Sequence, residues 1–138
     1  MRHAVYGNQL GRNTNQAKAL YRSLVSELLD HGRIETTVAK AKAVIPIIDK
    51  TINFAKKNTI AARREVVKIL GSEKLLGKIF TEVAPKYSNR NSGYSRIIRL
   101  GNRFSDAAKL AILELVEEDP KVQNDDQVKS HKTRKTRV

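Results

Sequence analysis

The sequence predicts an α+β fold of two layers, in which a small three-stranded sheet packs against about four helices. Three observations predict it. Apolar residues recur at helical spacing in four stretches, three shorter stretches are β-branched or continuously apolar, and Gly, Pro, Asn or Thr separates most of them. The expected helices lie near residues 14–31, 38–57, 60–70 and 73–84, and the expected strands near residues 33–37, 94–100 and 109–116.

The first helix follows a capping residue, Asn13 or Thr14, whose side chain can accept a hydrogen bond from the first turn. Gly32 should end this helix in the left-handed conformation. Lys18 and Arg22 lie four residues apart and so share one outward face. That face could hold phosphates, although such pairs are more often simply hydrated.

The segment 33–37 is β-branched and predicts a strand, after which an apolar stripe predicts a long helix over residues 38–57. Pro46 falls inside this helix. Because proline has no N–H to donate and its ring crowds the preceding turn, we expect the helix to kink or split near Val44 or Ile45.

Two shorter helices should follow as a compact helical pair. Asn58 and Thr59 interrupt the helical pattern before the third helix, and Gly71 closes it. Ser72 is a suitable cap for the fourth helix, which we expect Pro85 to terminate.

The last two expected strands, 94–100 and 109–116, are joined by a short loop rich in turn residues. This arrangement predicts an antiparallel hairpin. Since an isolated hairpin is marginally stable at best, we expect the strand at 33–37 to join the same sheet.

Composition points to a soluble intracellular protein with a polyanionic partner. The chain has 138 residues, no cysteine, a net charge of +13 and a pI of about 10.2. No apolar run approaches the roughly 20 residues that a membrane span needs, and the first residues lack the apolar region of a signal peptide. A charge this positive favours nucleic acid as the partner.

The charge distribution suggests three parts. Residues 1–104 hold 20 Lys and Arg against 7 Asp and Glu, residues 105–119 hold 1 against 5, and residues 120–138 hold 6 against 2, which gives +13, −4 and +4. Residues 1–12 show no periodicity and carry Arg2, His3 and Arg12, so we expect an extended arm there, followed by a globular domain at 13–119 and a flexible basic tail at 120–138.

Nothing in the sequence indicates an enzyme, a cofactor or a metal site. The only histidines are His3, His31 and His131, and no CxxC or HExxH spacing is present. The seven glycines are dispersed among apparent caps and turns rather than gathered in a phosphate-binding loop. The acids at 117–119 and at 125–126 could hold magnesium, but adjacent exposed acids are usually solvated.

Residues 86–103 are the most informative stretch for function. Lys86, four arginines and two tyrosines occur there without any acid. Guanidinium groups match phosphate oxygens, and tyrosine rings can stack on bases, so the stretch favours RNA. The alternative is a solvated basic loop whose tyrosines pack on the core.

Three segments together carry a family resemblance. They are Met1-Arg2-His3 with Leu10-Gly11-Arg12, residues 33–37 with Lys40-Ala41-Lys42, and residues 93–97 with Arg103 and residues 112–115. In this order and spacing the chain resembles, over about residues 1–117, the L17 family of bacterial large-subunit ribosomal proteins. The resemblance implies an α+β fold with a small mixed sheet, a structural role on ribosomal RNA without catalysis, and neighbouring ribosomal proteins such as the L32 family.

The resemblance also implies functional residues. It places Arg2, His3 and Arg12 in an extended N-terminal arm that reaches RNA, Lys40 and Lys42 at the start of the long helix, and Tyr94, Arg96 and Arg103 on the hairpin that meets RNA. Together with the basic and aromatic candidates found by composition, the expected RNA-binding set is Arg2, His3, Arg12, Arg22, Lys40, Lys42, Arg63, Arg64, Lys86, Tyr87, Arg90, Tyr94, Arg96, Arg99 and Arg103.

The resulting hypothesis is a rigid domain that directs one basic flank, containing Arg96, Arg99 and Arg103, onto folded ribosomal RNA. Contacts to phosphates and 2′-hydroxyls would recognise RNA shape rather than base sequence. Two alternatives remain open at this point: a nucleoid-type DNA-binding protein, which would prefer duplex DNA, and an RNA-processing enzyme, which would turn over RNA in magnesium.

Overall fold

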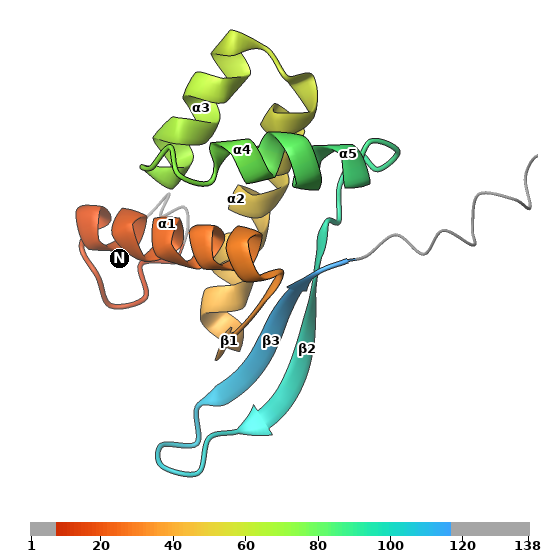
Figure 1. Cartoon of the computed structure of the whole chain (residues 1–138). Coiled ribbons are helices and arrows are strands. Elements are labelled where there is room, and N and C mark those ends of the chain that lie inside the picture. Colours follow the sequence, from red (N-terminus) through yellow and green to blue (C-terminus); the bar gives the residue numbers. More distant parts are fainter. Residues whose placement is uncertain (1–7, 117–138) are drawn as a thin grey trace, which may run out of the picture.

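The computed structural model describes residues 8–116, which form an α+β domain (Figure 1). This confirms the predicted fold class and the approximate place of every element. The elements are α1 (Thr14–His31), β1 (Arg33–Thr37), α2 (Val38–Lys57), α3 (Ile60–Leu70), α4 (Leu76–Lys78), the π-helical turn η1 (Ile79–Val83), α5 (Ala84–Lys86), β2 (Ser95–Asn102) and β3 (Lys109–Leu115).

The sheet has the strand order β1-β3-β2, with both neighbours antiparallel to the central strand. The predicted hairpin and the predicted addition of β1 are therefore confirmed. The resemblance implied a mixed sheet, but the observed sheet is purely antiparallel. Strands β1 and β2 run in the same direction, but β3 lies between them, so no parallel pair forms.

Strand β2 extends two residues beyond the predicted end at Leu100 because it contains a bulge. The pairing register with β3 shifts between Arg99 and Gly101, and Gly101 has a φ of 111°. A glycine there allows the strand to absorb an extra residue and continue. Gly101 and Asn102, residue types that are common in turns, thus belong to the strand.

Helix α1 is closed at both ends by the predicted residues. The Asn13 carboxamide oxygen accepts a hydrogen bond from the Gln16 amide at 2.9 Å, and the Gln16 side chain accepts one from the Asn13 amide at 3.3 Å. Gly32 adopts a φ of 78° and donates to the Leu28 carbonyl. Together these bonds satisfy groups that every helix leaves unpaired at its ends.

Helix α2 is continuous through Pro46, so of the kink or split expected near Val44 or Ile45, the split does not occur. Pro46 is exposed, whereas Val44 and Ile48 on either side of it are fully buried. Burying each aliphatic side chain contributes about 1.5–3 kcal/mol, which together offsets the roughly 3 kcal/mol that an interior proline costs. Packing therefore holds the helix together.

The fourth helical segment differs from its prediction at both ends. It begins at Leu76, because Ser72 and Glu73 instead accept hydrogen bonds within a turn that precedes it. It continues past Pro85 to Lys86. In the π turn before Pro85, the Ala84 amide bonds to the Ile79 carbonyl, and Pro85 falls in the first turn of α5, where a missing N–H is tolerated.

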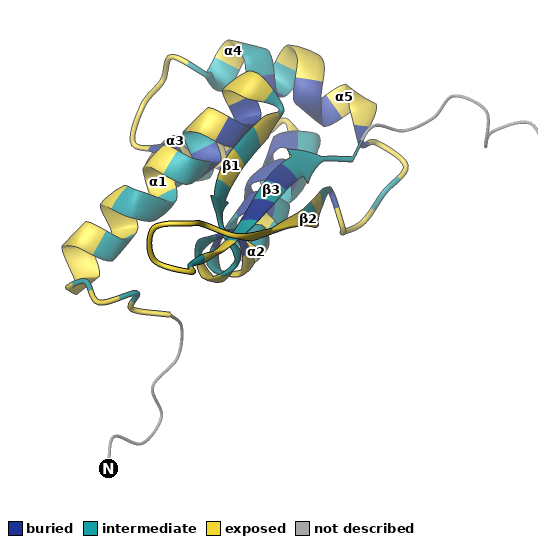
Figure 2. Ribbon diagram, turned by 90° about the horizontal axis from the view of Figure 1, so that it is seen from below, coloured by how far each residue is buried: buried dark blue, intermediate teal, exposed yellow. Residues whose placement is uncertain are grey.

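The core lies between the helices and one face of the sheet (Figure 2). Along β3, Ala111 and Leu113 point to this inner face and are fully buried. Their partners on the outer strands share it, because opposed residues in a sheet lie on the same face. The largest fully buried side chains are Tyr94, Leu28, Leu29, Ile48, Ile52, Ile79 and Leu113.

The far end of the β2–β3 hairpin extends beyond the helices, at the bottom of Figure 1. Apolar side chains are exposed along it: Ile98, Leu100 and, at the tip, Phe104, which is 108% exposed. This end of the hairpin is thus available to a partner.

Residues 8–12 form a turn against α1 rather than an extended strand. Leu10 and Gly11 both have positive φ, the Arg12 amide bonds to the Gln9 carbonyl at 3.0 Å, and the Tyr21 hydroxyl donates to the Asn8 carbonyl. The rest of the predicted arm, including Arg2 and His3, and the predicted tail at 120–138 lie outside the described residues.

Candidate nucleic-acid interface

The arginines of β2 point to opposite faces of the sheet. Arg96 is paired with Glu114 and Arg99 with Ala111, and successive residues of a strand alternate between faces. Ala111 belongs to the buried inner face, so Arg99 emerges on the side of the helices and Arg96 on the outer side. The expectation that Arg96, Arg99 and Arg103 share one basic flank is therefore wrong.

Arg96 takes part in an ion pair on the outer face of the sheet. Its Nε donates to Oε1 of Glu114, which also lies opposite Arg33 on β1. The Arg96 side chain remains 63% exposed. This row of two arginines around one glutamate keeps one net positive charge, but Glu114 already occupies part of the hydrogen-bonding capacity of Arg96.

Arg103 closes the hairpin loop with Asp106. Its Nε and Nη2 donate to the two carboxylate oxygens at 2.9 and 2.6 Å, and the Ala108 amide donates to Oδ1 at 3.2 Å. These hydrogen bonds, from Arg103 above all, lower the pKa of Asp106 from its ordinary value to about 2. The same contact raises the pKa of Arg103. Arg103 is thus primarily a loop-closing residue.

Tyr87 and Tyr94, expected to stack on bases, lie in the core. They are 3% and 0% exposed, and their rings meet edge to face with centroids 5.3 Å apart. Because a buried ring has no free face on which a base could stack, neither tyrosine is a candidate for RNA contact. The alternative interpretation, packing on the core, is the correct one.

Tyr94 anchors the loop before β2 to helix α2. Its hydroxyl contacts Oδ1 of Asn53 at 2.5 Å and the Arg90 carbonyl at 3.0 Å, and Lys56 donates to the same carbonyl. The amide of Tyr94 donates to the Asp49 carboxylate at 3.4 Å. This network fixes the backbone from which Arg90 projects.

Three further predicted arginines have structural partners. Arg12 donates to the Leu10 carbonyl at 2.9 Å. Arg22 donates to the Lys68 carbonyl at 3.3 Å, near the end of α3, where a positive charge favours the helix dipole. Arg63 bonds to Asn58 and lies over the Phe80 ring at 5.1 Å. Each of these interactions stabilises the fold locally.

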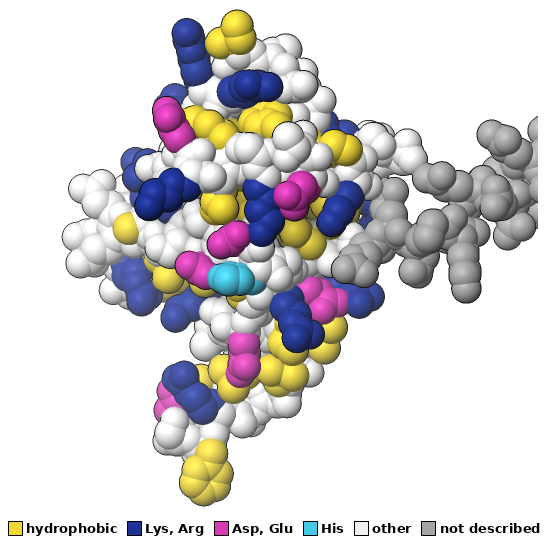
Figure 3. All heavy atoms as spheres, viewed as in Figure 1, with side chains coloured by type: hydrophobic (Ala, Val, Ile, Leu, Met, Phe, Trp, Pro, Cys, Tyr) yellow, Lys and Arg dark blue, Asp and Glu magenta, His cyan; other side chains and the backbone are white. Residues whose placement is uncertain are grey.

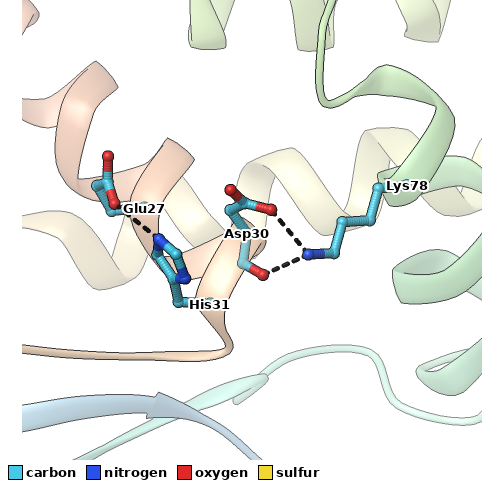
Figure 4. A network of polar contacts seen from close by, with 4 residues as sticks. All are labelled: Glu27, Asp30, His31 and Lys78. Atoms are coloured by element: carbon cyan, nitrogen blue, oxygen red, sulfur yellow. Dashed lines mark hydrogen bonds and ion pairs between the residues drawn. The ribbon is translucent and has the colours of Figure 1, made fainter.

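The face shown in Figure 3 mixes both signs of charge. It contains a crevice of about 1110 Å³ lined by Arg33, Lys78, Lys86 and Arg96 but also by Asp30 and Glu114. Figure 4 shows Lys78 donating to the Asp30 carboxylate at 2.8 Å beside the Glu27–His31 pair. The hydrogen bond from Lys78 lowers the pKa of Asp30. Acids thus offset much of the basic charge here.

In a second groove, all the charged side chains of the lining are basic. It lies between the first turns of α2 and the β2–β3 hairpin, has a volume of about 800 Å³, and is lined by Lys42, Arg99 and Lys109 without any acidic side chain. Lys42 and Arg99 belong to the predicted set. Lys109 does not: its place beside Arg99 depends on the hairpin register, although the short distance in sequence between the two strands could have suggested it.

The other predicted cations stand apart from this groove. Lys40 lies one turn into α2 and is half-buried, Arg64 is exposed on α3, and Lys86 is exposed in α5 at the mixed crevice. In Figure 1, α3 and the hairpin tip lie at opposite ends of the molecule. The described candidates therefore do not form one continuous face.

Among residues 8–116, no helix is long and apolar enough to cross a membrane. In the same part of the chain, no three His, Cys, Asp or Glu side chains are grouped as metal ligands would be. The fold and the net charge of +13 define a small, strongly basic α+β protein.

Comparison with known proteins gives the family. The model of the family described as ribosomal protein L17 matches residues 20–116, well over half of the chain. The chain therefore belongs to the ribosomal protein L17 family.

Individual relatives agree with this assignment, and each bears the name large ribosomal subunit protein bL17. The protein of Thermodesulfovibrio yellowstonii is 48% identical over 117 residues, which cover 85% of this chain and 88% of the relative. That of Methylacidiphilum infernorum is 45% identical over 124 residues, covering 90% and 95%. That of Syntrophotalea carbinolica is 44% identical over 119 residues, covering 86% and 77%.

Proposed function

We propose that this protein is a structural component of the large ribosomal subunit that binds large-subunit ribosomal RNA and catalyses no reaction itself. The observation that carries the proposal is membership of the L17 family, whose relatives are named as large-subunit proteins. The net charge of +13 supports RNA as the partner, because a ribosomal protein of this size must neutralise phosphates where it lies against them.

The RNA-contacting residues proposed here are exposed cations whose charge no described acid offsets. Lys42, Arg64 and Arg99 meet this description, and they belong to α2, α3 and β2. Lys40, Lys86 and Arg90 remain candidates beside them. Arg96 and Arg103 are proposed to position the hairpin and to add charge at its two ends. Arg2 and His3 stay in the proposal as parts of an RNA-reaching arm.

The protein would act by shape and charge. Its rigid core presents cations on several elements, which suits contacts to the phosphates and 2′-hydroxyls of folded RNA rather than readout of base edges. The exposed apolar side chains Ile98, Leu100 and Phe104 would meet a neighbouring ribosomal protein, since exposed apolar groups on a small protein often mark such interfaces. The resemblance suggests the L32 family as one candidate, in the ribosomes of the cytoplasm.

Salt dependence of RNA binding tests the proposal. The full chain would be titrated with a large-subunit rRNA transcript at increasing salt concentration. We expect the logarithm of the affinity to fall linearly with the logarithm of salt, with a slope of several units, as when roughly 5–10 phosphates are neutralised. A flat response, or no binding at low salt, would overturn the proposal.

Competition between duplex DNA and rRNA distinguishes the proposed function from a nucleoid-type DNA-binding protein. Duplex DNA of matched length and charge would be added to the preformed protein–RNA complex. We expect folded rRNA to be displaced only by a large excess of DNA, because the duplex lacks the 2′-hydroxyls and folded shape of the RNA. Preferential binding to DNA would favour the alternative, and turnover of the transcript in magnesium would show an RNA-processing enzyme.

A further inference from the structure

The groove between α2 and the β2–β3 hairpin gathers cations from three separate elements. Lys42 comes from α2, Arg99 from β2 and Lys109 from β3. Arg99 reaches this side because its register partner, Ala111, faces inward toward the helices. In Figure 2 the lower part of α2 lies beside this hairpin. Residues far apart in sequence thus supply one concentrated patch of positive charge.

The charge of this groove is not offset by the protein itself. None of the side chains lining it is acidic, and within residues 8–116 neither Lys42, Arg99 nor Lys109 forms an ion pair. The other two hairpin arginines, Arg96 and Arg103, are both paired with carboxylates. Three like charges around one hollow repel each other, and an anion placed between them relieves that repulsion.

The wall of the groove adds to its preference for an anion. Thr37, at the N-terminus of α2, makes no side-chain capping hydrogen bond, and the first turn of the helix contains no acid. Thr37 and Ala39 both line the groove. The partial positive charge of the helix end is therefore directed at the same space as the three cations.

We propose that this groove holds the sugar–phosphate backbone of the ribosomal RNA. The inference rests on the proposed function and gives it a location. An RNA strand carries one charge per nucleotide, so a short length of it meets all three cations at once, which a single small anion in a groove of about 800 Å³ does not. An apolar peptide would instead leave the three cations buried without partners.

A charge-neutralising variant tests the location. Lys42→Gln, Arg99→Gln and Lys109→Gln would be combined, and a control would combine Lys18→Gln, Lys50→Gln and Lys74→Gln. Both lose three charges from exposed positions outside the core, and the control positions lie outside the groove. Affinity for the rRNA transcript would be measured from low to moderate salt, and thermal unfolding would show that both variants fold.

The groove variant should reduce the salt-dependence slope by about 2–3 units, roughly one for each phosphate that it no longer neutralises. The control should keep the slope of the unaltered protein at every salt concentration, because its three positions lie outside the groove and neutralise no phosphate there. Equal slopes for the two variants would overturn the groove as the site. If the unaltered protein itself shows no salt-dependent binding, the proposed function fails instead.

Blocking the groove gives an independent measurement. The chain contains no cysteine, so Ala39→Cys creates a single thiol in the lining, and Ser72→Cys creates one on the exposed loop after α3. Each would be coupled to a bulky neutral maleimide. We expect the adduct at position 39 to weaken rRNA binding at least tenfold and the adduct at position 72 to leave it unchanged. Unhindered binding with position 39 blocked would contradict the proposal.

Discussion

Arg103 and Asp106 lock the tip of the β2–β3 hairpin through two parallel hydrogen bonds, from Nε at 2.9 Å and from Nη2 at 2.6 Å. The planar guanidinium matches the carboxylate, so one residue pair fixes both the distance and the orientation of the loop ends. This explains how a loop of exposed residues keeps a defined shape beyond the helices.

The pair predicts a local pH dependence. The pKa of Asp106 is lowered to about 2, so its contribution to stability is complete above the ordinary carboxyl pKa of 3.8 and is lost as the pH falls from there through about 2. NMR titration of the Asp106 carboxyl should show the low midpoint. In Arg103→Gln the midpoint should rise toward 3.8, and a midpoint unchanged by this substitution would exclude Arg103 as the cause.

Tyr94→Phe should destabilise the domain without unfolding it. The substitution keeps the buried ring but removes the hydroxyl from Oδ1 of Asn53, whereas the Arg90 carbonyl keeps its hydrogen bond from Lys56; an unsatisfied polar group in the interior costs about 1–3 kcal/mol. Urea denaturation should show a lower free energy of unfolding with an unchanged slope. A destabilisation below about 0.5 kcal/mol would mean that Lys56 satisfies the network alone.

Pro46→Ala should stabilise the protein. Alanine restores the missing amide donor inside α2, and helix propensity favours alanine by about 3 kcal/mol, whereas the greater freedom of the unfolded chain takes back roughly 1 kcal/mol. We expect a net gain of about 1–2 kcal/mol, visible as a higher Tm. Pro85→Ala, at the start of α5 where the N–H is not needed, should gain much less. A lower Tm for Pro46→Ala would show that α2 depends on the proline ring.

Asn13→Ala should shorten or weaken α1. It removes the side-chain acceptor for the Gln16 amide and with it half of the reciprocal cap, at a cost of about 1 kcal/mol. Circular dichroism and thermal unfolding would measure the loss. Asn13→Ser should retain most of the stability, because serine also caps well. Equal stability of the alanine and serine variants would contradict a capping role.

Local signals in the sequence were sufficient for the elements. Asn13, Gly32 and Gly71 act within a few residues of themselves, and each lies at the helix end that it predicts. Pro85 was interpreted by the same kind of local rule and gave a wrong helix boundary, and the split that the rule allowed at Pro46 does not occur. The effect of each proline on its helix depends on the burial of neighbouring side chains or on a π turn, and a short stretch of sequence predicts neither.

The candidate site was harder to predict because it depends on faces and register. A spacing of three residues between Arg96 and Arg99 already places them on opposite sides of a strand, and attention to that period would have separated them. By contrast, Tyr94 packs in the core against Tyr87 and bonds to Asn53 on α2, and Lys109 lines the same groove as Arg99 because of the bulged hairpin register. Such contacts between residues far apart in the sequence can be identified only from the folded structure.

The order of strands in the sheet also governs how the domain is made. The central strand β3 follows both of its neighbours in the chain, and more than seventy residues separate β1 from its partner, from Thr37 to Leu110. During synthesis the helices can form early, but the sheet closes only when β3 has left the ribosome. An incomplete chain ending before residue 109 would thus carry two unpaired strands and be a ready target for chaperones and proteases.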